Sequence, residues 1–242
     1  MNIAGKTVLI TGANRGIGRA LVSEALRRGA KRVYAGTRGG LPDADQRVTP
    51  LTLDVTNTSQ IERAAQDVEA LDVLINNAGI AIYDDLGNPD VIEQHLAVNM
   101  LGSLRVAQAF LPLLKRSRGA IVNNLSLLSL APLPVIPAYS ISKAAALSMT
   151  QSLRTQLAGQ GVTVHAVFLG AIDTDMNRGV DIPKASPESA ASGIFEGLEN
   201  GEDDIFPDPQ SQPLAEGWRA GAVKALEREF ALFGQESTTN PG

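Results

Sequence analysis

A tyrosine and a lysine stand one helical turn apart in the middle of the chain, as Tyr139 and Lys143. Both fall in a predicted helix over residues 138–158, so their side chains emerge on one face. A free phenol has a pKa of about 10 and is a poor acid–base catalyst at neutral pH. A nearby ammonium group favours the phenolate, so we expect Lys143 to lower the pKa of Tyr139. The pair could then exchange a proton with an alcohol or carbonyl oxygen, although this spacing alone is more often a surface pair.

A glycine-rich turn near the start of the chain has a second chemical use. Residues 11–18 read Thr-Gly-Ala-Asn-Arg-Gly-Ile-Gly, between a predicted strand over 7–10 and a predicted helix over 17–28 that Gly29 ends. Glycines here permit a tight turn and let the backbone approach a pyrophosphate, which meets free N–H groups at the helix N-terminus. The position after the first strand therefore favours a dinucleotide site over an ordinary turn.

Short apolar segments alternate with helical stretches along the whole chain. This pattern predicts a parallel sheet with helices on both faces. No change in composition divides the chain, so we expect one doubly wound α/β domain, a Rossmann fold, over residues 1–234, and a polar, disordered tail over 235–242. The expected strands are 7–10, 32–35, 48–53, 73–75, 120–125, 162–168 and 204–206. The expected helices are 17–28, 59–69 capped by Thr58 or Ser59, 89–115 capped by Asn88, 138–158, 186–199 and 214–233.

The order Thr-Gly-x-x-x-Gly-x-Gly, together with Tyr-x-x-x-Lys, resembles the short-chain dehydrogenase/reductase family, of the NADP(H)-preferring carbonyl reductase type. The resemblance extends from Lys6 to about Phe233 and rests on several motifs in the family's order. It implies an oxidoreductase that moves hydride between a nicotinamide and a ketone, an aldehyde or a secondary alcohol. It also implies a homotetramer or dimer, packed through the helices predicted at 89–115 and 138–158.

The resemblance further implies a catalytic set of four residues. Tyr139 is then the general acid/base, and Lys143 also hydrogen-bonds the nicotinamide ribose. Ser126, at the end of the strand predicted over 120–125, holds the substrate oxygen near Tyr139, and Ser129 is the weaker alternative. Asn99 positions a water in a proton relay; asparagine is unfavourable inside a helix, so its presence there calls for a reason.

The cofactor implied is NADP(H). The second strand ends without the carboxylate that would bind a ribose 2′-hydroxyl, because Thr37 stands at that position. Arg38 directly after it can pair with a 2′-phosphate, and Arg15 matches a second basic position. By resemblance Asp54 and Val55 flank the adenine, and the asparagines of the segment 76–79 tie the edge of the sheet together. The implied cofactor contacts are Gly12, Asn14, Arg15, Gly16, Ile17, Gly18, Thr37, Arg38, Asp54, Val55, Asn76, Ala78, Gly79, Tyr139, Lys143, Gly170, Ile172 and Thr174.

Two segments depart from the family's pattern. Leu169 replaces the usual proline before Gly170, which frees a backbone angle and adds a donor, so we expect a modest change in loop rigidity. Residues 39–46 replace a helix found in many members.

Residues 175–185 are expected to be a mobile lid over the substrate. The expected pocket wall suits an apolar ketone or alcohol, although its residues could equally be core or subunit contacts; it comprises Leu127, Leu128, Leu133, Val135, Ile136 and Met176.

Composition argues against several other partners. The net charge is −5 with dispersed basic residues, which disfavours nucleic acid and anionic membranes. The chain has no cysteine, and its first apolar segment is too short for a signal sequence or a membrane span, so we expect a cytoplasmic protein. His95 and His165 lie far apart in the sequence, so no metal site is expected.

Two other functions are compatible with such a fold: a cofactor-sensing binding protein without turnover, and a halohydrin-type lyase. A sensor has no need of a proton relay, and the lyases lack the glycine turn and replace the lysine. The presence of Ser126, Tyr139, Lys143 and the glycine turn together therefore favours the oxidoreductase.

Overall fold

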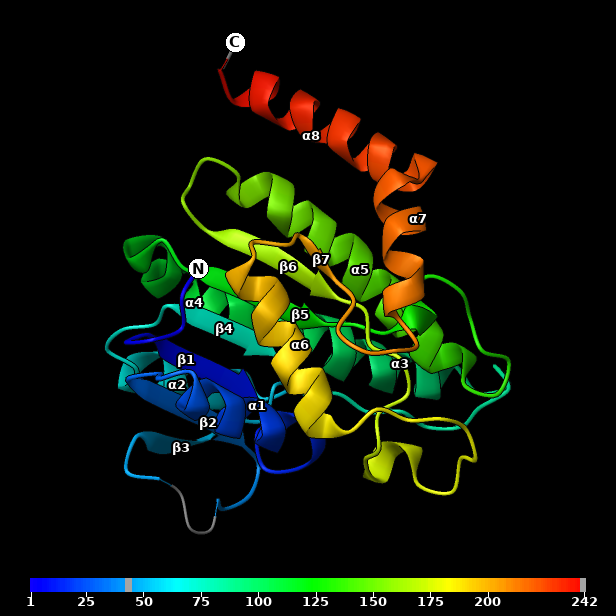
Figure 1. Ribbon diagram of the computed structural model, residues 1–242, viewed down its shortest axis with the longest axis horizontal. Helices are drawn as coiled ribbons and strands as arrows, with labels where there is room; N and C mark the ends of the chain where they lie inside the picture. Colours follow the sequence, from blue (N-terminus) through cyan, green and yellow to red (C-terminus); the bar gives the residue numbers. More distant parts are fainter. Residues whose placement is uncertain (42–44, 240–242) are drawn as a thin grey trace.

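One parallel sheet forms the centre of the protein (Figure 1). The computed structural model describes the backbone of residues 1–41 and 45–239, and the side chains of that part up to residue 231. In it, seven strands pair in the order β3-β2-β1-β4-β5-β6-β7. The strands are β1 (Thr7–Thr11), β2 (Arg32–Thr37), β3 (Val48–Thr52), β4 (Val73–Asn76), β5 (Ala120–Asn124), β6 (Thr163–Val167) and β7 (Asp204–Ile205). The predicted fold class is confirmed, and the predicted strands lie within one or two residues of their observed ends.

The central strands are buried on both faces, as their continuous apolar sequences predict. Every residue of β1, β4 and β5 is buried. In the edge strand β3, Val48 and Leu51 are buried, whereas Pro50 and Thr52 are exposed. A proline cannot donate to a neighbouring strand, so it is tolerated at this outer position and would disrupt a central one.

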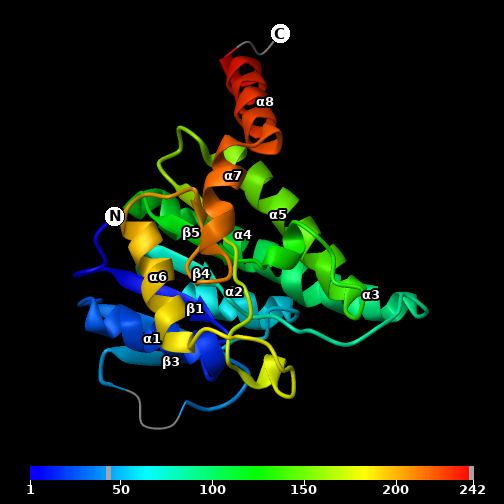
Figure 2. The same cartoon turned by 45° about the vertical axis from the view of Figure 1, so that its right-hand side comes forward.

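Helices cover both faces of the sheet (Figures 1 and 2). Leu9 and Ile10 of β1 point to opposite faces, because side chains alternate along a strand. Ile10 belongs to the core formed with α1 and α6, whereas Leu9 belongs to the core formed with α2, α4 and α5. The bounds of these helices are α1 (Gly16–Arg27), α2 (Thr58–Asp67), α4 (Ser103–Ser117), α5 (Pro137–Leu157) and α6 (Pro187–Glu199).

The long helix predicted over 89–115 exists but is not α-helical throughout. It consists of α3 (Pro89–Leu96), a π-helical segment over Ala97–Gly102, and α4. Asn88 caps its start as predicted, accepting a hydrogen bond from the backbone N–H of Asp90 at 3.0 Å. A π-helical turn admits an extra residue, and such turns are frequent at functional sites. Asn99 lies inside this turn.

Of the helices described, the continuous stretch Pro89–Ser117 alone is long and apolar enough to cross a membrane by length and composition. In this structure its buried face packs against the sheet, where Val106, Phe110 and Leu114 are fully enclosed in the core. The stretch is therefore a core helix of the domain.

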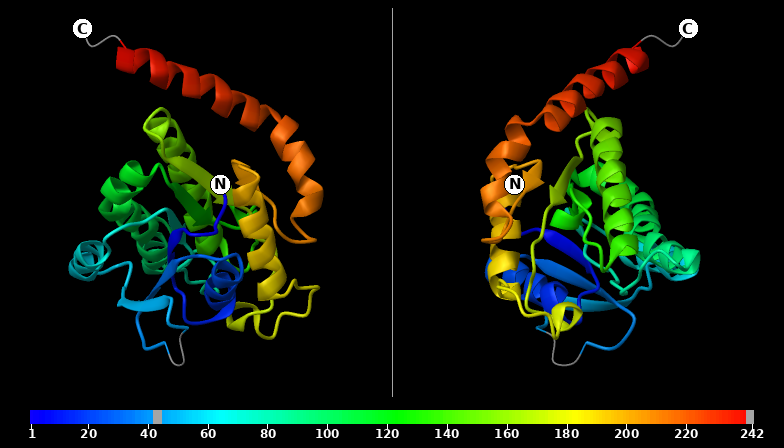
Figure 3. Two further views of the ribbon diagram at one scale, coloured as in Figure 1. Left: turned by 60° about the vertical axis from the view of Figure 1, so that its left-hand side comes forward. Right: turned by 90° about the vertical axis from the view of Figure 1, so that its right-hand side faces the viewer.

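The C-terminal helix predicted over 214–233 is two helices, α7 (Ala215–Ala220) and α8 (Ala222–Thr239). Gly221 separates them with an extended backbone, ψ 159°. Figure 3 shows α8 projecting away from the body of the molecule. Residues 235–239, which were expected to be disordered, continue this helix, and residues 240–242 lie outside the described part.

Two smaller expectations concern chain segments beside the sheet. The cap of α2 is Asn57, whose side chain accepts from the backbone N–H of Gln60 at 3.1 Å, and the expected caps Thr58 and Ser59 are the first helical residues instead. The side chain of Asn57 accepts from a backbone N–H group at the start of α2 that has no partner within the helix, so the cap lies one residue earlier than expected. The segment 39–46, expected to lack a helix, lies partly outside the described residues, at 42–44.

Candidate active site

The glycine turn is a tight loop between β1 and α1. A Cβ atom on Gly18 would lie 2.0 Å from the carbonyl oxygen of Gly12, so this position excludes any side chain. Gly12 itself has φ +66°, a conformation that favours glycine. Within the described structure Arg15 precedes α1 and provides no side-chain cap, so the first amides of the helix are available to an anion. The turn therefore fits a pyrophosphate.

Two asparagines tie the glycine turn to the ends of β4 and β5. Asn77 donates from Nδ2 to the carbonyl oxygen of Thr11 at 2.9 Å, and Asn124 donates to Asn77 Oδ1 at 3.0 Å. The hydroxyl of Thr11 accepts from the backbone N–H groups of Asn77 and Ala78. As expected, asparagine side chains hold this edge of the sheet together.

Asn76, an expected cofactor contact, uses its side chain elsewhere. Its Nδ2 donates to Asn123 Oδ1 at 2.9 Å and to the carbonyl oxygen of Ser103 at 3.3 Å, on the α4 side of the sheet. Asn123 in turn donates to Thr150 Oγ1 at 3.0 Å. The amide of Asn76 thus links β4 to the helices behind it and is not directed at the glycine turn.

The end of β2 presents an exposed positive charge. Arg38 is exposed, whereas the neighbouring Thr37 is buried and its hydroxyl accepts from the backbone N–H of Gly39 at 2.9 Å. The hydroxyl and backbone N–H of Thr56 lower the pKa of Asp54, and the charge of Arg38 acts in the same direction. Arg38 therefore lies near this carboxylate with its guanidinium in solvent, where a phosphate can reach it.

The other two residues expected at the adenosine end differ in exposure. Arg15 is exposed, and its guanidinium lies 3.9 Å from the carboxylate of Asp175. Val55 is buried, and a Cβ on Gly102 would come within 2.7 Å of its Cγ2. Val55 thus packs under the π-helical turn, which leaves little of its side chain for an adenine.

Tyr139 and Lys143 lie together on the first turns of α5. The ammonium nitrogen of Lys143 lies 5.7 Å from the centre of the phenol ring and donates to the carbonyl oxygen of Asn124 at 2.8 Å. Lys143 is buried and Tyr139 is half-buried. The predicted helix thus brings the two groups to one face, beside the carboxyl end of β5.

The expected effect of Lys143 on Tyr139 is wrong for this structure. Burial raises the pKa of Tyr139 to about 12, and the hydroxyl of Ser126 opposes this shift in part. Burial also lowers the pKa of Lys143 to about 8. The cause in both cases is that an enclosed site penalises the charged form, phenolate or ammonium alike. Near pH 7 the phenol therefore carries its proton.

Ser126 and Asn99 are both held firmly near this pair. Ser126 caps a short 3-10 turn over Leu127–Ser129, accepting from the N–H of Leu128 at 3.1 Å, while Ser129 Oγ accepts from the backbone N–H of Ser126. Asn99 exchanges two hydrogen bonds with the backbone of Ile80, at 2.9 and 3.0 Å.

The Asn99 amide also donates to the hydroxyl of Ser142 at 2.9 Å. A Cβ on Gly79 would lie 3.2 Å from Asn99 Oδ1 and 3.9 Å from Lys143 Nζ, so both groups border Gly79. Asn99 is thus placed beside the lysine, with its amide engaged by the protein.

The loop after β6 extends across the site to the glycine turn. Ile172 is buried and forms a bridge with Ala185. A Cβ on Gly16 would lie 3.1 Å from Cγ2 of Thr174, which places Thr174 against the turn. The three expected contacts Gly170, Ile172 and Thr174 therefore lie on one segment that spans the proposed cofactor site.

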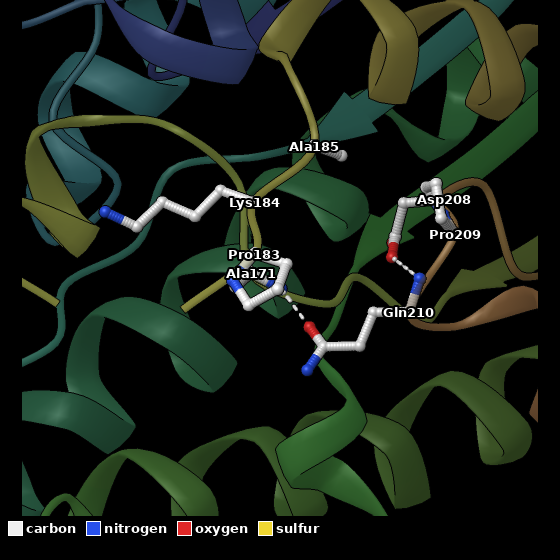
Figure 4. A pocket seen from close by; sticks show the side chains of 7 residues that line it. All are labelled: Ala171, Pro183, Lys184, Ala185, Asp208, Pro209 and Gln210. Atoms are coloured by element: carbon white, nitrogen blue, oxygen red, sulfur yellow. Dashed lines mark hydrogen bonds between the residues drawn. The ribbon is translucent and has the colours of Figure 1, made fainter. Parts of the chain in front are cut away.

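The expected pocket wall does not line the cavity that the described structure shows beside the loop after β6. Leu127, Leu128 and Ile136 are partly buried. Val135 is 53% exposed, Met176 47% and Leu133 44%, so these three present apolar surface to solvent. A cavity of about 370 Å³ lies instead between the loop after β6, residues 183–185 and the segment after β7 (Figure 4). Its lining residues are Ala171, Pro183, Lys184, Ala185, Asp208, Pro209 and Gln210.

Comparisons with known proteins agree with this geometry. The family model described as short chain dehydrogenase matches residues 6–184. The chain belongs to the short chain dehydrogenase family. The resemblance that the sequence motifs indicated is thereby confirmed.

Several relatives within the family are similar over most of this chain. The ketoacyl reductase HetN of Nostoc sp. is 32% identical over 82% of this chain and 77% of its own. The 3-oxoacyl-acyl-carrier-protein reductase FabG of Thermotoga maritima is 34% identical, with 80% and 84% covered. The crystal structure of a short chain dehydrogenase from Burkholderia cenocepacia in complex with NADP has a TM-score of 0.86 at 39% identity, covering 95% of this chain and 98% of that one.

Sequence reasoning missed several residues that contact the expected site residues of this short chain dehydrogenase. His95 is fully buried and meets the ring of Tyr139 edge-on, with 6.2 Å between ring centres. Its Nε2 accepts from the backbone N–H of Ile82 at 3.0 Å. Asn124 and Asp208 likewise act through contacts between distant parts of the chain. The position of His95 one turn before Asn99 was the available signal, because both fall on the same helix.

Proposed function

We propose that this short chain dehydrogenase is an NADP(H)-dependent oxidoreductase that reduces a ketone or aldehyde to an alcohol, with Tyr139 as the general acid. The observation that carries the proposal is the convergence of Tyr139, Lys143 and Ser126 beside a glycine turn that excludes side chains at Gly18. A bound reduced nicotinamide would supply hydride to the carbonyl carbon.

Each catalytic side chain has a role that its surroundings support. The high pKa of Tyr139 keeps its proton in place at neutral pH, which is the form that protonates a developing alkoxide. Ser126 would hold the substrate oxygen near that phenol. Lys143, fixed by the carbonyl of Asn124, would stabilise the phenolate that proton donation leaves and bind the nicotinamide ribose.

A 2′-phosphorylated dinucleotide fits the two exposed arginines. Arg38 follows β2 and Arg15 lies in the glycine turn, and neither Thr37 nor its neighbours add a carboxylate at the position that would bind a free ribose hydroxyl. The Burkholderia relative was crystallised with NADP, which supports the same assignment here. Asn14, Ile17 and the glycines of the turn would contact the pyrophosphate.

The substrate is a small molecule with an apolar body. The support is the apolar surface that Val135, Met176 and Leu133 expose near the start of α5 and on the lid. We further propose a cytoplasmic homodimer or homotetramer, packed through the long helix Pro89–Ser117 and α5. Apolar residues of that long helix that the sheet leaves partly uncovered, such as Leu101 and Leu104, support this arrangement.

Turnover with a panel of ketones and aldehydes tests the proposal. NADPH absorbance should fall when a carbonyl is added and the corresponding alcohol should accumulate. Tight NADPH binding without turnover on any member of a broad panel would instead indicate a cofactor-sensing protein.

Exchange of Arg38 for aspartate should reverse the cofactor preference. The variant loses a charge-assisted contact to the 2′-phosphate and gains a carboxylate that repels it, so kcat/KM with NADPH should fall by about tenfold to a hundredfold relative to NADH. The matched control is Arg32→Asp at the other end of β2. An unchanged NADPH-to-NADH ratio in Arg38→Asp would contradict the phosphate assignment.

The pH dependence of reduction should follow Lys143. Its pKa of about 8 lies below the ordinary value, so the ammonium form is present below about pH 8 and is lost above it. We expect kcat/KM for carbonyl reduction to be level below that pH and to decline above it, because this ratio reports groups of the free enzyme.

The variant Lys143→Met should have lower activity and no decline near this pH. Lys31→Met, at an exposed position just before β2, serves as the control and should retain the wild-type profile. A decline that persists in Lys143→Met would assign the titration to another group.

A further inference from the structure

The loop that follows β6 is held by two side chains from a distant segment. The backbone N–H of Gly170 donates to Asp208 Oδ2 at 2.9 Å, and that of Ala171 donates to Gln210 Oε1 at 2.7 Å. Figure 4 shows Gln210 extending from the segment after β7 toward Ala171, across the edge of the 370 Å³ cavity. We call Asp208 and Gln210 the loop clamp.

Asp208 is a buried carboxylate whose two oxygens are both engaged. It has no exposed surface, and Oδ2 also accepts from the hydroxyl of Ser211 at 3.0 Å. Oδ1 accepts from the backbone N–H groups of Gln210 and Ser211, each at 3.0 Å. A carboxylate with this many donors is fixed in orientation, so it can hold Gly170 in one place.

The glycine at position 170 is matched to the clamp. A Cβ there would lie 2.6 Å from Gln210 Oε1 and 2.7 Å from Asp208 Oδ1. Any larger residue would displace both side chains. The close approach of Asp208 and Gln210 to this loop therefore requires a glycine at position 170.

The clamped loop connects the parts of the proposed site. The carbonyl oxygen of Leu169 accepts from the N–H of Leu127, directly after Ser126, at 2.9 Å. At its other end Thr174 lies against Gly16. A shift of Gly170 would thus be transmitted both to the substrate side and to the cofactor side.

We propose that Asp208 and Gln210 position this loop against the nicotinamide end of the cofactor, and that they supply the restraint that leucine at position 169 cannot. Leu169 leaves its backbone angle φ free, where a proline would fix it. Asp208 is a positioning residue in this account, since it acts through Gly170. The inference rests on the proposed function.

Asp208→Asn is the direct test. The asparagine amide has one oxygen in place of two. The backbone N–H groups of Gln210 and Ser211 favour placement of that oxygen at the Oδ1 position. Its NH2 group would then face the N–H of Gly170, donor against donor, which costs that contact. We expect kcat for carbonyl reduction to fall by about tenfold and the isotope effect with 4-deuterated NADPH to rise, because hydride transfer becomes slower in a misaligned pair.

The controls separate positioning from folding. Asp203→Asn makes the same chemical change at an exposed neighbour and should leave both quantities unaltered. In the Asp208→Asn background, Leu169→Pro should recover part of kcat, since proline restores the missing restraint. Gln210→Leu breaks only the contact to Ala171 and keeps the proposal testable if Asp208→Asn does not fold.

The proposal is overturned if Asp208→Asn, or in its place Gln210→Leu, matches Asp203→Asn in kcat and isotope effect. The proposed function fails separately, if the wild-type protein reduces no carbonyl. In that event the clamp is still tested by NADPH affinity, which Asp208→Asn should weaken by about tenfold and Asp203→Asn should not.

Discussion

Replacement of Tyr139 by phenylalanine is expected to lower kcat for carbonyl reduction by about a thousandfold. The variant keeps the ring and its edge-on contact with His95, and it removes only the hydroxyl that donates the proton. Because the proposed partner of this hydroxyl is the substrate oxygen, the affinity for NADPH should stay nearly unchanged. Steady-state kinetics and NADPH fluorescence titration measure the two quantities on the same preparation.

Tyr83→Phe is the matched control for this variant. The side chain of Tyr83 is 66% exposed, so removal of its hydroxyl should alter neither turnover nor binding. Retained turnover in Tyr139→Phe would refute the role of Tyr139 as general acid. Loss of turnover accompanied by an equal loss of NADPH affinity would indicate a disturbed site and contradict the assignment as well.

Replacement of Gly18 by alanine should abolish most NADPH binding. The added Cβ would lie 2.0 Å from Gly12 O and 2.7 Å from Asn77 Nδ2, so the glycine turn must open. We expect the Kd for NADPH to rise by about a hundredfold, equivalent to about 3 kcal/mol, and the free energy of unfolding to fall by about 1–3 kcal/mol. Fluorescence titration and urea denaturation measure these changes.

Gly217→Ala provides the comparison for Gly18→Ala. A Cβ at Gly217 meets no atom within 4 Å, and the position lies inside α7. Alanine there should leave binding intact and stabilise the helix slightly. Wild-type NADPH affinity in Gly18→Ala would contradict the placement of the pyrophosphate at this turn.

The fold could be predicted because its determinants are local. Each central strand is a short apolar run bounded by glycine or polar residues. Two helices, α3 and α6, begin with a capping side chain, Asn88 or Ser186, that is followed directly by proline. Helix ends at Gly29 and Gly159 are equally explicit, since both glycines adopt positive φ. These signals do not depend on the rest of the chain.

The interruptions within helices were less accessible to sequence reasoning. The apolar pattern around Asn99 fits a continuous helix, and within the π-helical turn Gly102 packs on Val55, which lies in the loop after β3. The break at Gly221 divides the last helix although a single glycine is tolerated in many helices. The contact of Gly102 with Val55 joins segments far apart in the sequence, which the local apolar pattern does not reveal.

The site shows the same division between local and long-range causes. The helical spacing of Tyr139 and Lys143 predicts that they share a face, and they do. Their pKa values could not be predicted, because spacing indicates the neighbouring charge and does not reveal how deeply the pair is buried. Asp208 was missed for a similar reason: its contact with Gly170 joins segments far apart in the sequence.

Transfer of deuterium from 4-deuterated NADPH to a ketone tests the central claim most directly. If the phenol of Tyr139 protonates the oxygen while hydride arrives at the carbon, the wild-type protein should deliver deuterium from one face of the nicotinamide only. The product alcohol would then carry it at the former carbonyl carbon. A saturated NADPH complex that yields no deuterated alcohol with any ketone, or an alcohol without the label, would contradict the account.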